Sequence, residues 1–271
     1  SEFGTKRAAD FATRFTDAGE NVVVNGRKFY STGALFAHLV PIVAVDDENR
    51  AWYAIADRAA PGLSVIDDWS SFGQRTTGSG TVLIDQVYVP KTHLVPAYKG
   101  YDRPTADGAI FQIIQAAIDA GIARAAIEET VSFVRTKTRP WVDSGLDHAW
   151  QDPYTIQAVG DLHLRLNAAE ALLDRAGLAV DRAVADPTVD TVAQAQIAVA
   201  EAKVLTTEIA LAATNKLFEL AGTRSTLGEH NLDRHWRNAR THTLHDPVRW
   251  KYAILGNYYL NGVNPPLHAW S

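Results

Sequence analysis

The sequence predicts an α+β protein in which a β domain precedes a bundle of about four helices. Short apolar runs separated by turns fill the first part of the chain, and a stretch rich in proline and glycine follows them. Long alanine-rich segments with helical spacing make up the rest. These observations predict a β domain at residues 1–95, a linker at residues 96–108 and a helical bundle at residues 109–271.

The apolar runs of the first region have the length of β-strands. Residues 22–24 lead into Asn25-Gly26, a dipeptide typical of a tight hairpin turn, and residues 28–31 are expected to continue as a strand. Strands of this kind, separated by polar turns, are typical of a small barrel or sandwich. Further strands are predicted at residues 39–45, 51–56, 81–84 and 87–89.

The second region contains four segments with helical patterns, at residues 109–136, 154–185, 192–221 and 231–259. Their alanine content favours close packing between helices. In the first segment, apolar residues recur at the spacing of a helix and are predicted to share one face. These residues are Ile110, Ile113, Ile114, Ala117, Ile118 and Gly121.

Composition and charge exclude several classes of protein. The net charge of -5 implies no broad basic surface for nucleic acid, and no apolar run reaches the roughly 20 residues that span a bilayer. The absence of cysteine excludes disulfides, thiolate catalysis and cysteine-ligated metal. The charged first ten residues do not resemble a secretion signal, so we expect a cytoplasmic protein without a membrane or nucleic-acid partner. Because methionine is also absent, we expect the natural chain to begin earlier or to be processed.

The densest polar cluster is residues 234–247, in which His242 and His245 are three apart and would share one face of a helix. Asp246, four residues after His242, could orient that ring, and His235 could lie on the same stripe. Three interpretations remain open: a solvated helix end, a metal site, or an imidazole pair that binds a cofactor or an oxygen intermediate. No strong metal motif is present, and composition does not choose among the three.

Two further groups of residues have both a structural and a functional interpretation. Residues 73–81 form either an ordinary glycine-rich turn or a run of hydroxyl and N–H groups suited to a phosphate or a flavin edge. Arg135 and Arg139 either complement a helix dipole or bind an anionic phosphate, and Arg224 is a further candidate cation. The aromatic residues that could line a pocket, or pack in loops and core, are Trp141, Trp150 and Tyr154.

Several of these strings, taken in order, resemble the acyl-CoA dehydrogenase superfamily. Residues 72–81 and 85–90 are similar to its middle β domain, and residues 220–222 and 233–240 are similar to its C-terminal helical signature. The resemblance covers nearly the whole chain and implies a middle β-barrel domain followed by a C-terminal four-helix bundle. The N-terminal helical domain of the superfamily has no counterpart in this sequence.

Within the superfamily, residues 139–141, 152–156, 236–238 and 240–247 resemble the dibenzothiophene monooxygenase group. The resemblance implies an oxidoreductase that receives reduced FMN, rather than FAD, from a separate flavin reductase and uses O2. It would oxygenate a sulfur, or a nitrogen, of an apolar organosulfur substrate through a C4a-hydroperoxyflavin, and aromatic substrates are candidates. The resemblance also implies a homotetramer.

The resemblance assigns roles to individual residues. His242 and His245 would be catalytic, beside the reactive face of the flavin, and no metal is implied. Residues of the β domain would lie against the flavin, and arginines would hold the FMN phosphate, with a neighbouring subunit contributing in a tetramer. The cofactor-binding residues implied in this way are Tyr30, Thr32, Trp69, Arg135, Arg139 and Arg224.

One departure separates the two reaction types of the superfamily. In one large group of acyl-CoA dehydrogenases a glutamate abstracts the substrate proton, and here the same register holds His245, Asp246 and Pro247. Asp246 is one methylene shorter than glutamate, and a misplacement near 1 Å can cost about 100-fold in rate. We therefore expect an oxygenation, with a flavin-dependent acyl-CoA dehydrogenase and a non-catalytic fragment as the alternatives.

Overall fold

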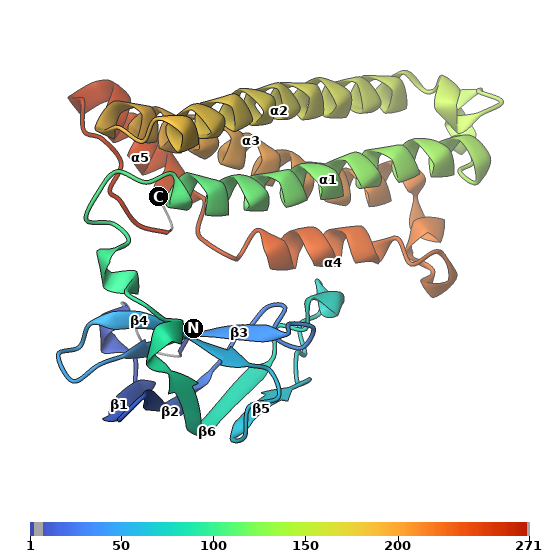
Figure 1. The fold of residues 1–271 in the computed structure, drawn as a ribbon. Coiled ribbons are helices and arrows are strands. Elements are labelled where there is room, and N and C mark those ends of the chain that lie inside the picture. Colours follow the sequence, from blue (N-terminus) through green and yellow to red (C-terminus); the bar gives the residue numbers. More distant parts are fainter. Residues whose placement is uncertain (3–7, 270–271) are drawn as a thin grey trace. The chain divides into compact units, whose positions relative to one another are not determined.

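The computed structural model describes residues 1–2 and 8–269, and the chain forms two compact units (Figure 1). The β unit comprises Ser1–Ser71 and Arg75–Arg103, and the helical unit comprises Phe72–Gln74 and Pro104–Ser271. The fold is therefore mixed α+β, as the sequence predicts. The short segment Phe72–Gln74 belongs by its contacts to the helical unit.

The β unit contains one seven-stranded sheet with the strand order β5-β6-β2-β1-β3-β4-β7. Neighbouring strands are antiparallel, except that β1 meets β3 in parallel. The end strands β5 and β7 do not pair with each other among the described residues, so the predicted barrel is not closed by hydrogen bonds. The apolar core of the unit includes Val22, Val24, Ile42, Val87 and Val89. The strands are β1 Arg14–Ala18, β2 Asn21–Lys28, β3 Leu39–Val45, β4 Ala51–Asp57, β5 Leu63–Ile66, β6 Thr81–Pro90 and β7 Leu94–Val95.

The hairpin turn predicted at Asn25-Gly26 is wrong, because β2 continues through this dipeptide. The pairing of β2 with β6 shifts its register between Val24 and Gly26, which marks a β-bulge. Gly26 has a φ of +157°, and a side chain there would overlap Thr13. The chain instead turns between β1 and β2 at Gly19, whose φ of +76° lies in the left-handed region.

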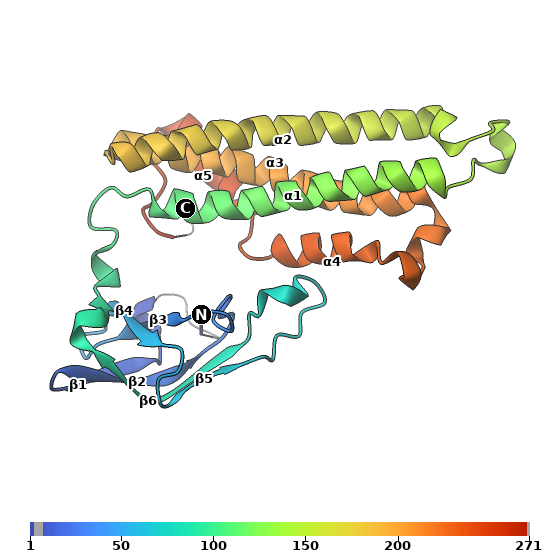
Figure 2. The same cartoon turned by 45° about the vertical axis from the view of Figure 1, so that its right-hand side comes forward.

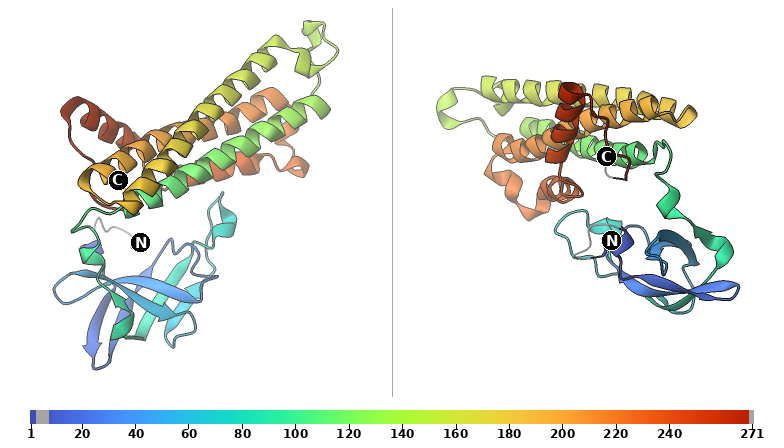
Figure 3. Two further views of the ribbon diagram at one scale, coloured as in Figure 1. Left: turned by 45° about the horizontal axis from the view of Figure 1, so that its top comes forward. Right: turned by 90° about the vertical axis from the view of Figure 1, so that its left-hand side faces the viewer.

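The helical unit contains five α-helices in the part of the chain that the structure describes, and the three long ones lie side by side (Figure 2). The shorter helix α4 packs against α1 and α3, and α5 crosses the long helices (Figure 3). The first three predicted helices are confirmed to within a few residues. The helices are α1 Asp107–Thr136, α2 Pro153–Ala185, α3 Val189–Ala221, α4 Asp233–His242 and α5 Arg249–Asn261. Short 3-10 helices occupy Ala8–Asp10, Arg75–Thr77, Lys91–His93, Ala97–Lys99, Val142–Ser144, Ala149–Gln151, Thr223–Thr226 and Gly228–His230.

The boundaries of these helices follow from the local sequence. The side chain of Asp152 caps α2, whose first residue is Pro153, a position that tolerates proline because its N–H would have no partner within the helix. The single helix predicted at residues 231–259 is wrong, because Pro247 lies between α4 and α5 and a proline ends a helix before it. The predicted bundle of about four helices therefore becomes three long helices with two short ones packed against them.

The buried face of α1 differs from the apolar face that its isoleucines predict. Ile114 and Ile118 are 51% and 39% exposed, whereas the buried stripe runs through alanines and includes polar residues. Small side chains allow helix axes to approach closely, so α1 packs against α3 through its alanines rather than through its larger residues. The buried stripe includes Gln112, Ala116, Asp119, Ala120, Ala123, Ala126, Ile127 and Thr130.

By length and composition alone, α1 is also the single described helix that could cross a membrane. This differs from the expectation based on unbroken apolar runs, because α1 accumulates its alanines and isoleucines over 30 residues that also contain polar ones. Buried core helices pass the same test, and α1 contributes Ala123, Ala126 and Ile127 to the main core of the helical unit.

Candidate functional site

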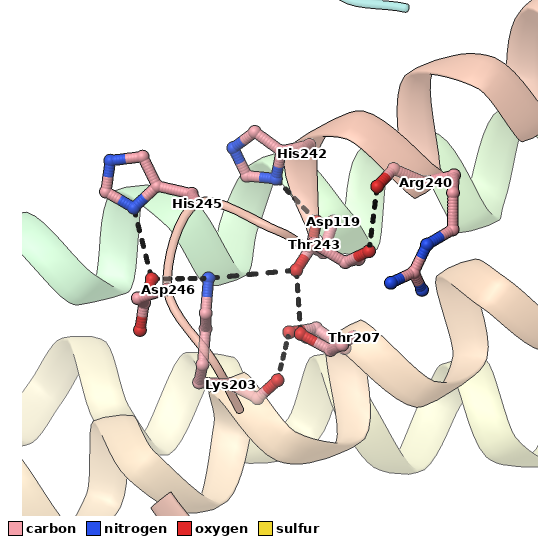
Figure 4. A network of polar contacts seen from close by, with 9 residues as sticks. Asp119, Lys203, Thr207, Arg240, His242, Thr243, His245 and Asp246 are labelled. Carbon is pink, nitrogen blue, oxygen red and sulfur yellow. Dashed lines mark hydrogen bonds and ion pairs between the residues drawn. The ribbon is translucent and has the colours of Figure 1, made fainter. Parts of the chain in front are cut away.

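His242, the last residue of α4, is held by a carboxylate from another helix. Its Nδ1 lies 2.6 Å from Oδ1 of Asp119 on α1, and the Asp119 side chain is completely buried (Figure 4). A carboxylate only accepts hydrogen bonds, so Nδ1 carries the hydrogen and donates it. The Nε2 atom of His242 is also buried and has no hydrogen-bond partner among the described residues. The ring therefore has one fixed nitrogen and one nitrogen available to another group.

Asp119 is held in turn by two residues of α3. Its Oδ2 accepts a hydrogen bond of 2.9 Å from Oγ1 of Thr207 and lies 3.8 Å from Nζ of Lys203. The Lys203 side chain is 1% exposed, and its Nζ also lies 3.7 Å from Oδ1 of Asp246 (Figure 4). One buried ammonium is therefore shared by two carboxylates. Because an uncompensated charge is unfavourable in the interior, each of these groups depends on the others.

His245 forms a second pair with Asp246. Its Nδ1 lies 3.1 Å from Oδ1 of Asp246, the oxygen that also faces Lys203. The His245 side chain is 49% exposed, whereas Asp246 is buried. Burial alone would raise the pKa of Asp246, but the hydrogen bond from His245 and the charges of Lys203 and Lys251 outweigh it. The pKa of Asp246 therefore lies below its ordinary value.

Two expectations about this cluster are wrong. His242 and His245 do not share a helix face, because α4 ends at His242 and His245 lies in the turn that follows. Asp246 does not orient His242, because its carboxylate pairs with His245 while Asp119 holds His242. The structure nevertheless brings both histidines into one polar network through Lys203.

A second buried lysine lies at this network. Lys251 on α5 is 2% exposed. Burial lowers the pKa of Lys251 to about 8, although the charge of Asp246 opposes the shift and that of Lys203 adds to it. Two aspartates and two lysines, all buried, therefore balance one another beside the two histidines.

The first turn of α4 is joined to α1 by a different pair. Glu129 accepts a hydrogen bond of 2.6 Å from Nε2 of His235 and another from the guanidinium of Arg234. The Glu129 side chain is 33% exposed. His235 and His242, seven residues apart on α4, thus each pair with a carboxylate of α1.

The segment Phe72–Gln74 lies against α4. The N–H of Gln74 donates to Oδ1 of Asn238 at 2.8 Å. A side chain on Gly73 would overlap the backbone of Arg237, so glycine permits this close approach. Packing against α4 therefore accounts for the first glycine of the predicted glycine-rich string.

The β unit holds three of the predicted flavin-binding residues. Tyr30 is exposed and has a φ of +52°, which is not compatible with a strand. Of the strand predicted at residues 28–31, only Lys28 lies in β2, and the prediction is wrong for residues 29–31. Its ring meets that of Trp69 edge to face, with centroids 6.0 Å apart. The hydroxyl of Thr32 lies 2.8 Å from that of Ser79 in the glycine-rich string. Aromatic rings and hydroxyl groups are thus presented by neighbouring loops of one unit.

Arg139 lines a pocket of about 230 Å³ in the helical unit. Trp141 and Tyr154 line the same pocket, which supports the pocket interpretation for two of the three aromatic residues. Two acids, Asp152 and Glu219, also line it, and both are engaged in local contacts. Arg139 is the cation among the lining residues and the group there that could pair with a phosphate, although the lining as a whole carries both signs of charge.

Arg135 and Arg224 are placed differently. The guanidinium carbon of Arg135 lies 5.4 Å from the ring centroid of Trp150, a cation–π contact. Arg224 is exposed on the 3-10 helix Thr223–Thr226 after α3. Thr138, beside the pocket arginine, donates a hydrogen bond to the carbonyl of Ala221. Arg139 and Arg224 therefore lie on segments that contact each other, whereas Arg135 contacts Trp150.

The sequence pattern does not mark Asp119 or Lys203 as functional residues, because they lie on helices remote in sequence from His242. The available signal is a charged residue on a stripe of small apolar residues, since Asp119 lies among the buried alanines of α1 and Lys203 among those of α3. Within residues 1–2 and 8–269, no group of three or more histidine, aspartate or glutamate side chains is placed to hold a metal ion.

Comparison with known proteins identifies the family to which this fold belongs. Residues 113–250, just over half of the chain, match the family described as acyl-CoA dehydrogenase, C-terminal domain. The chain belongs to the acyl-CoA dehydrogenase family, which confirms the predicted membership.

Within this family, the chain is similar to monooxygenases. It is 35% identical over 253 residues to the dibenzothiophene monooxygenase of Mycolicibacterium goodii, which covers 88% of this chain and 61% of the relative. The structure of the dibenzothiophene monooxygenase TdsC of Paenibacillus sp. A11-2 with FMN and indole has a TM-score of 0.91 at 30% identity, over 97% of this chain and 71% of that chain. The methanesulfinate monooxygenase MsuC of Pseudomonas fluorescens has a TM-score of 0.90 at 31% identity, over 97% and 70%.

These likenesses confirm the resemblance to the dibenzothiophene monooxygenase group. The chain spans less than two thirds of the length of the Mycolicibacterium relative. Both solved relatives share at least 30% identity with it and match nearly all of its residues, so the likeness extends over both the β unit and the helical unit.

Proposed function

We propose that the whole protein is a flavin-dependent monooxygenase that uses reduced FMN and O2 to oxygenate the sulfur of a small organosulfur substrate. The observation that carries the proposal is the buried Nε2 of His242, which has no partner among the described residues while Nδ1 is fixed by Asp119. A polar atom in this state needs a hydrogen-bonding group from outside the described residues. The relatives include a dibenzothiophene monooxygenase, a methanesulfinate monooxygenase and a structure with bound FMN. An oxygen species on the flavin and a sulfur substrate are therefore the groups that we propose for this position.

Reduced FMN, when bound, would supply the two electrons with which one oxygen atom of O2 is transferred to sulfur and the other leaves as water. The part of this chain is to hold a hydrogen bond at Nε2 of His242 and to exchange protons with water through the half-exposed His245. Both roles suit imidazole, because its two nitrogens can donate or accept near neutral pH.

The residues present fit a flavin. Arg139 offers a cation in a pocket of about 230 Å³, and we assign the FMN phosphate to it, with Arg224 on the neighbouring segment and Arg135 as a further candidate. Tyr30, Trp69 and Thr32 are assigned to the flavin because they present two rings and a hydroxyl on loops of the β unit. The proposed site residues are therefore His242, His245, Tyr30, Thr32, Trp69, Arg135, Arg139 and Arg224.

We further propose the organisation of the whole protein. A β domain at residues 1–95, a linker at 96–108 and a helical bundle domain at 109–271 would assemble as a homotetramer in the cytoplasm. A separate flavin reductase would deliver reduced FMN, because one relative is described as a probable FMNH2-dependent monooxygenase. Aromatic and alkyl sulfur compounds are both candidate substrates, because relatives of both descriptions match this chain.

The surroundings of Asp246 count against a flavin-dependent acyl-CoA dehydrogenase. A general base for an α-proton needs a carboxylate with a raised pKa and a free oxygen near the substrate. Asp246 has a lowered pKa, and its Oδ1 faces both His245 and Lys203. Asp246 is therefore poorly suited to act as that base, which counts against dehydrogenation by this residue.

The test uses the full-length protein with a flavin reductase, NADH, FMN and ¹⁸O2. Dibenzothiophene, an alkyl sulfinate and an acyl-CoA thioester are offered separately, and the products are analysed by mass spectrometry. We expect ¹⁸O in a sulfur product and its loss in His242→Ala and His245→Ala. His163→Ala, an exposed histidine of α2, is the matched control and retains activity. Reduction of an electron acceptor with the thioester, without ¹⁸O incorporation, would contradict the proposal.

A further inference from the structure

Lys203 lies at the centre of a chain of polar contacts that joins the two proposed catalytic histidines (Figure 4). From one side, His242 Nδ1 lies 2.6 Å from Asp119, and Asp119 lies 3.8 Å from Nζ of Lys203. From the other side, His245 Nδ1 lies 3.1 Å from Asp246, and Asp246 lies 3.7 Å from the same Nζ. Three segments remote in sequence, α1, α3 and the turn after α4, therefore meet at one ammonium group.

We propose that Asp119 and Lys203 are positioning residues for the oxygenation reaction. Asp119 fixes the ring and the tautomer of His242, and Lys203 holds both carboxylates and, through them, both imidazoles. The inference rests on the proposed function for the identity of the reacting group, but it concerns contacts within this chain alone.

The contact with Asp119 determines which nitrogen of His242 is available. A neutral imidazole carries one hydrogen, and the acceptor-only carboxylate at Nδ1 assigns that hydrogen to Nδ1. Nε2 is then an acceptor in the neutral ring and a donor in the charged ring. Without Asp119 the ring could rotate or change tautomer, and Nε2 would no longer be presented in one direction. The same logic applies to an aspartate that orients a catalytic histidine in a hydrolase triad.

The second oxygen of Asp119 explains why two residues of α3 are needed. Thr207 donates to Oδ2, and Lys203 faces the same oxygen, so the carboxylate cannot turn away from His242 without losing both contacts. Lys203 is placed between two carboxylates and has no hydrogen-bond partner of its own among the described residues. Its position matches an electrostatic role toward both carboxylates rather than a tight pair with either one.

A structural ion cluster would leave a different signature. Where ion pairs only join helices, each buried polar atom is expected to be satisfied within the cluster. Here Nε2 of His242, the atom at the end of this series of polar contacts, is buried and without a partner among the described residues. The contacts therefore end at an atom that is presented to another group, which is the arrangement of a positioning device.

Three substitutions in the full-length protein test the role of Asp119. Thr207→Val removes one hydrogen bond without changing the shape of the side chain, Asp119→Asn keeps an acceptor oxygen for Nδ1, and Asp119→Ala removes it. The first readout is the crystal structure of each variant without flavin, in which the orientation of the His242 ring is measured. We expect the ring to turn in Asp119→Ala, to stay in Asp119→Asn, and to become less ordered in Thr207→Val.

The second readout is the fraction of oxidised flavin that yields product rather than hydrogen peroxide. Asp119→Ala is expected to lower this fraction at least about tenfold, and Asp119→Asn to restore part of it, because general acid–base groups are worth 10²–10⁴-fold when placed correctly. Lys203→Met is expected to displace both His242 and His245 in its crystal structure, whereas Asp119→Ala displaces His242 alone. Thr207→Val keeps the inference testable if Lys203→Met does not fold.

Glu129→Ala is the matched control, because it removes the other carboxylate that joins α1 to a histidine of α4. It should leave the His242 ring and the product fraction unchanged. An unturned ring in Asp119→Ala, or an equal loss of product in Glu129→Ala, would overturn the positioning role. A wild-type protein that forms no oxygenated product would contradict the proposed function instead, and the ring orientations would still decide the positioning of His242.

Discussion

Helix α4 is joined to α1 by two histidine–carboxylate pairs that differ in their surroundings. At its first turn His235 meets Glu129, which is one third exposed and also binds Arg234. At its last residue His242 meets Asp119, which is completely buried. A histidine and a carboxylate thus form a contact with a partly exposed acid at one end of the helix and with a buried acid at the other.

The nitrogen that each ring uses also differs between the two pairs. His235 engages its carboxylate through Nε2, the outer nitrogen of the ring. His242 engages its carboxylate through Nδ1, so the outer nitrogen remains available. Interactions between exposed charges are screened by water, whereas a buried charge depends on every partner. The comparison therefore predicts that the first pair contributes to helix packing and that the second pair contributes to function.

Removal of one cation from each region is expected to give the largest difference in the free energy of unfolding. Lys203→Met leaves buried Asp119 and Asp246 without their shared cation, and breaking a buried ion pair in this way costs about 3–5 kcal/mol. Arg234→Met, in the partly exposed pair, should lower the free energy of unfolding by less than about 1 kcal/mol. Denaturant titration of both variants measures the difference. Equal losses would show that the two regions do not differ in burial as described.

A pH titration of stability tests the buried region in a second way. The pKa of Lys251 falls from 10.5 to about 8 in the folded protein. Between these pH values the unfolded chain binds one more proton than the folded chain, so this lysine makes stability rise with pH by about 1.4 kcal/mol per unit. The whole window contributes about 3 kcal/mol by the same relation.

The rise of stability between about pH 8 and pH 10.5 is expected to disappear in Lys251→Met. It should persist in Lys216→Met, whose lysine is partly exposed on α3 beside Glu219. Denaturant titrations at several pH values above neutrality measure it. Persistence of the rise in Lys251→Met would show that another group titrates in this window.

The two regions also show how much the sequence can predict. The positions of α1, α2 and α3 follow from alanine-rich segments with few helix breakers, and the pair His242 and His245 is visible as a local string. The partner of His242 is not visible, because Asp119 is separated from it by 123 residues and only tertiary packing brings them together. The sequence instead favours Asp246, which is near His242 in the chain but pairs with His245.

The isoleucines of α1 were a misleading signal for a related reason. Hydrophobicity marks Ile114 and Ile118, but the tight approach of α1 and α3 is made by alanines, and the larger residues remain exposed in the described chain. The charged residues Asp119 and Lys203 fall on that alanine stripe, where size rather than polarity decides what is buried. A single charged residue within a helical stripe of alanines is therefore the sequence feature that Asp119 and Lys203 share.

Substitution of His242 and of His235 tests whether only the buried pair contributes to the reaction. His242→Gln is expected to lower the rate of product formation about 100-fold, because it removes the imidazole from the end of the polar network. His235→Gln should leave the rate nearly unchanged and lower the free energy of unfolding by about 1 kcal/mol through its lost hydrogen bond. Initial rates with reduced FMN, measured below the unfolding temperature of both variants, test this. A similar loss of rate in both would remove the functional distinction between the pairs.

The smallest expected effect is the acid response of the exposed pair. Burial would raise the pKa of Glu129, but the hydrogen bond from His235 and the charge of Arg234 outweigh it, so the pKa lies below its ordinary value. A carboxylate of this kind contributes stability above the ordinary pKa of glutamate and loses it as the pH falls through the folded value.

The difference in unfolding free energy between the wild type and Glu129→Gln should therefore be present near neutral pH and disappear on acidification. Glu48→Gln, whose glutamate is 70% exposed, is the control and should show little difference at any pH. A Glu129→Gln difference that does not change with pH would assign the contact to packing rather than charge. Because Lys251 responds on the alkaline side and Glu129 on the acid side, the two regions can be titrated separately in one protein.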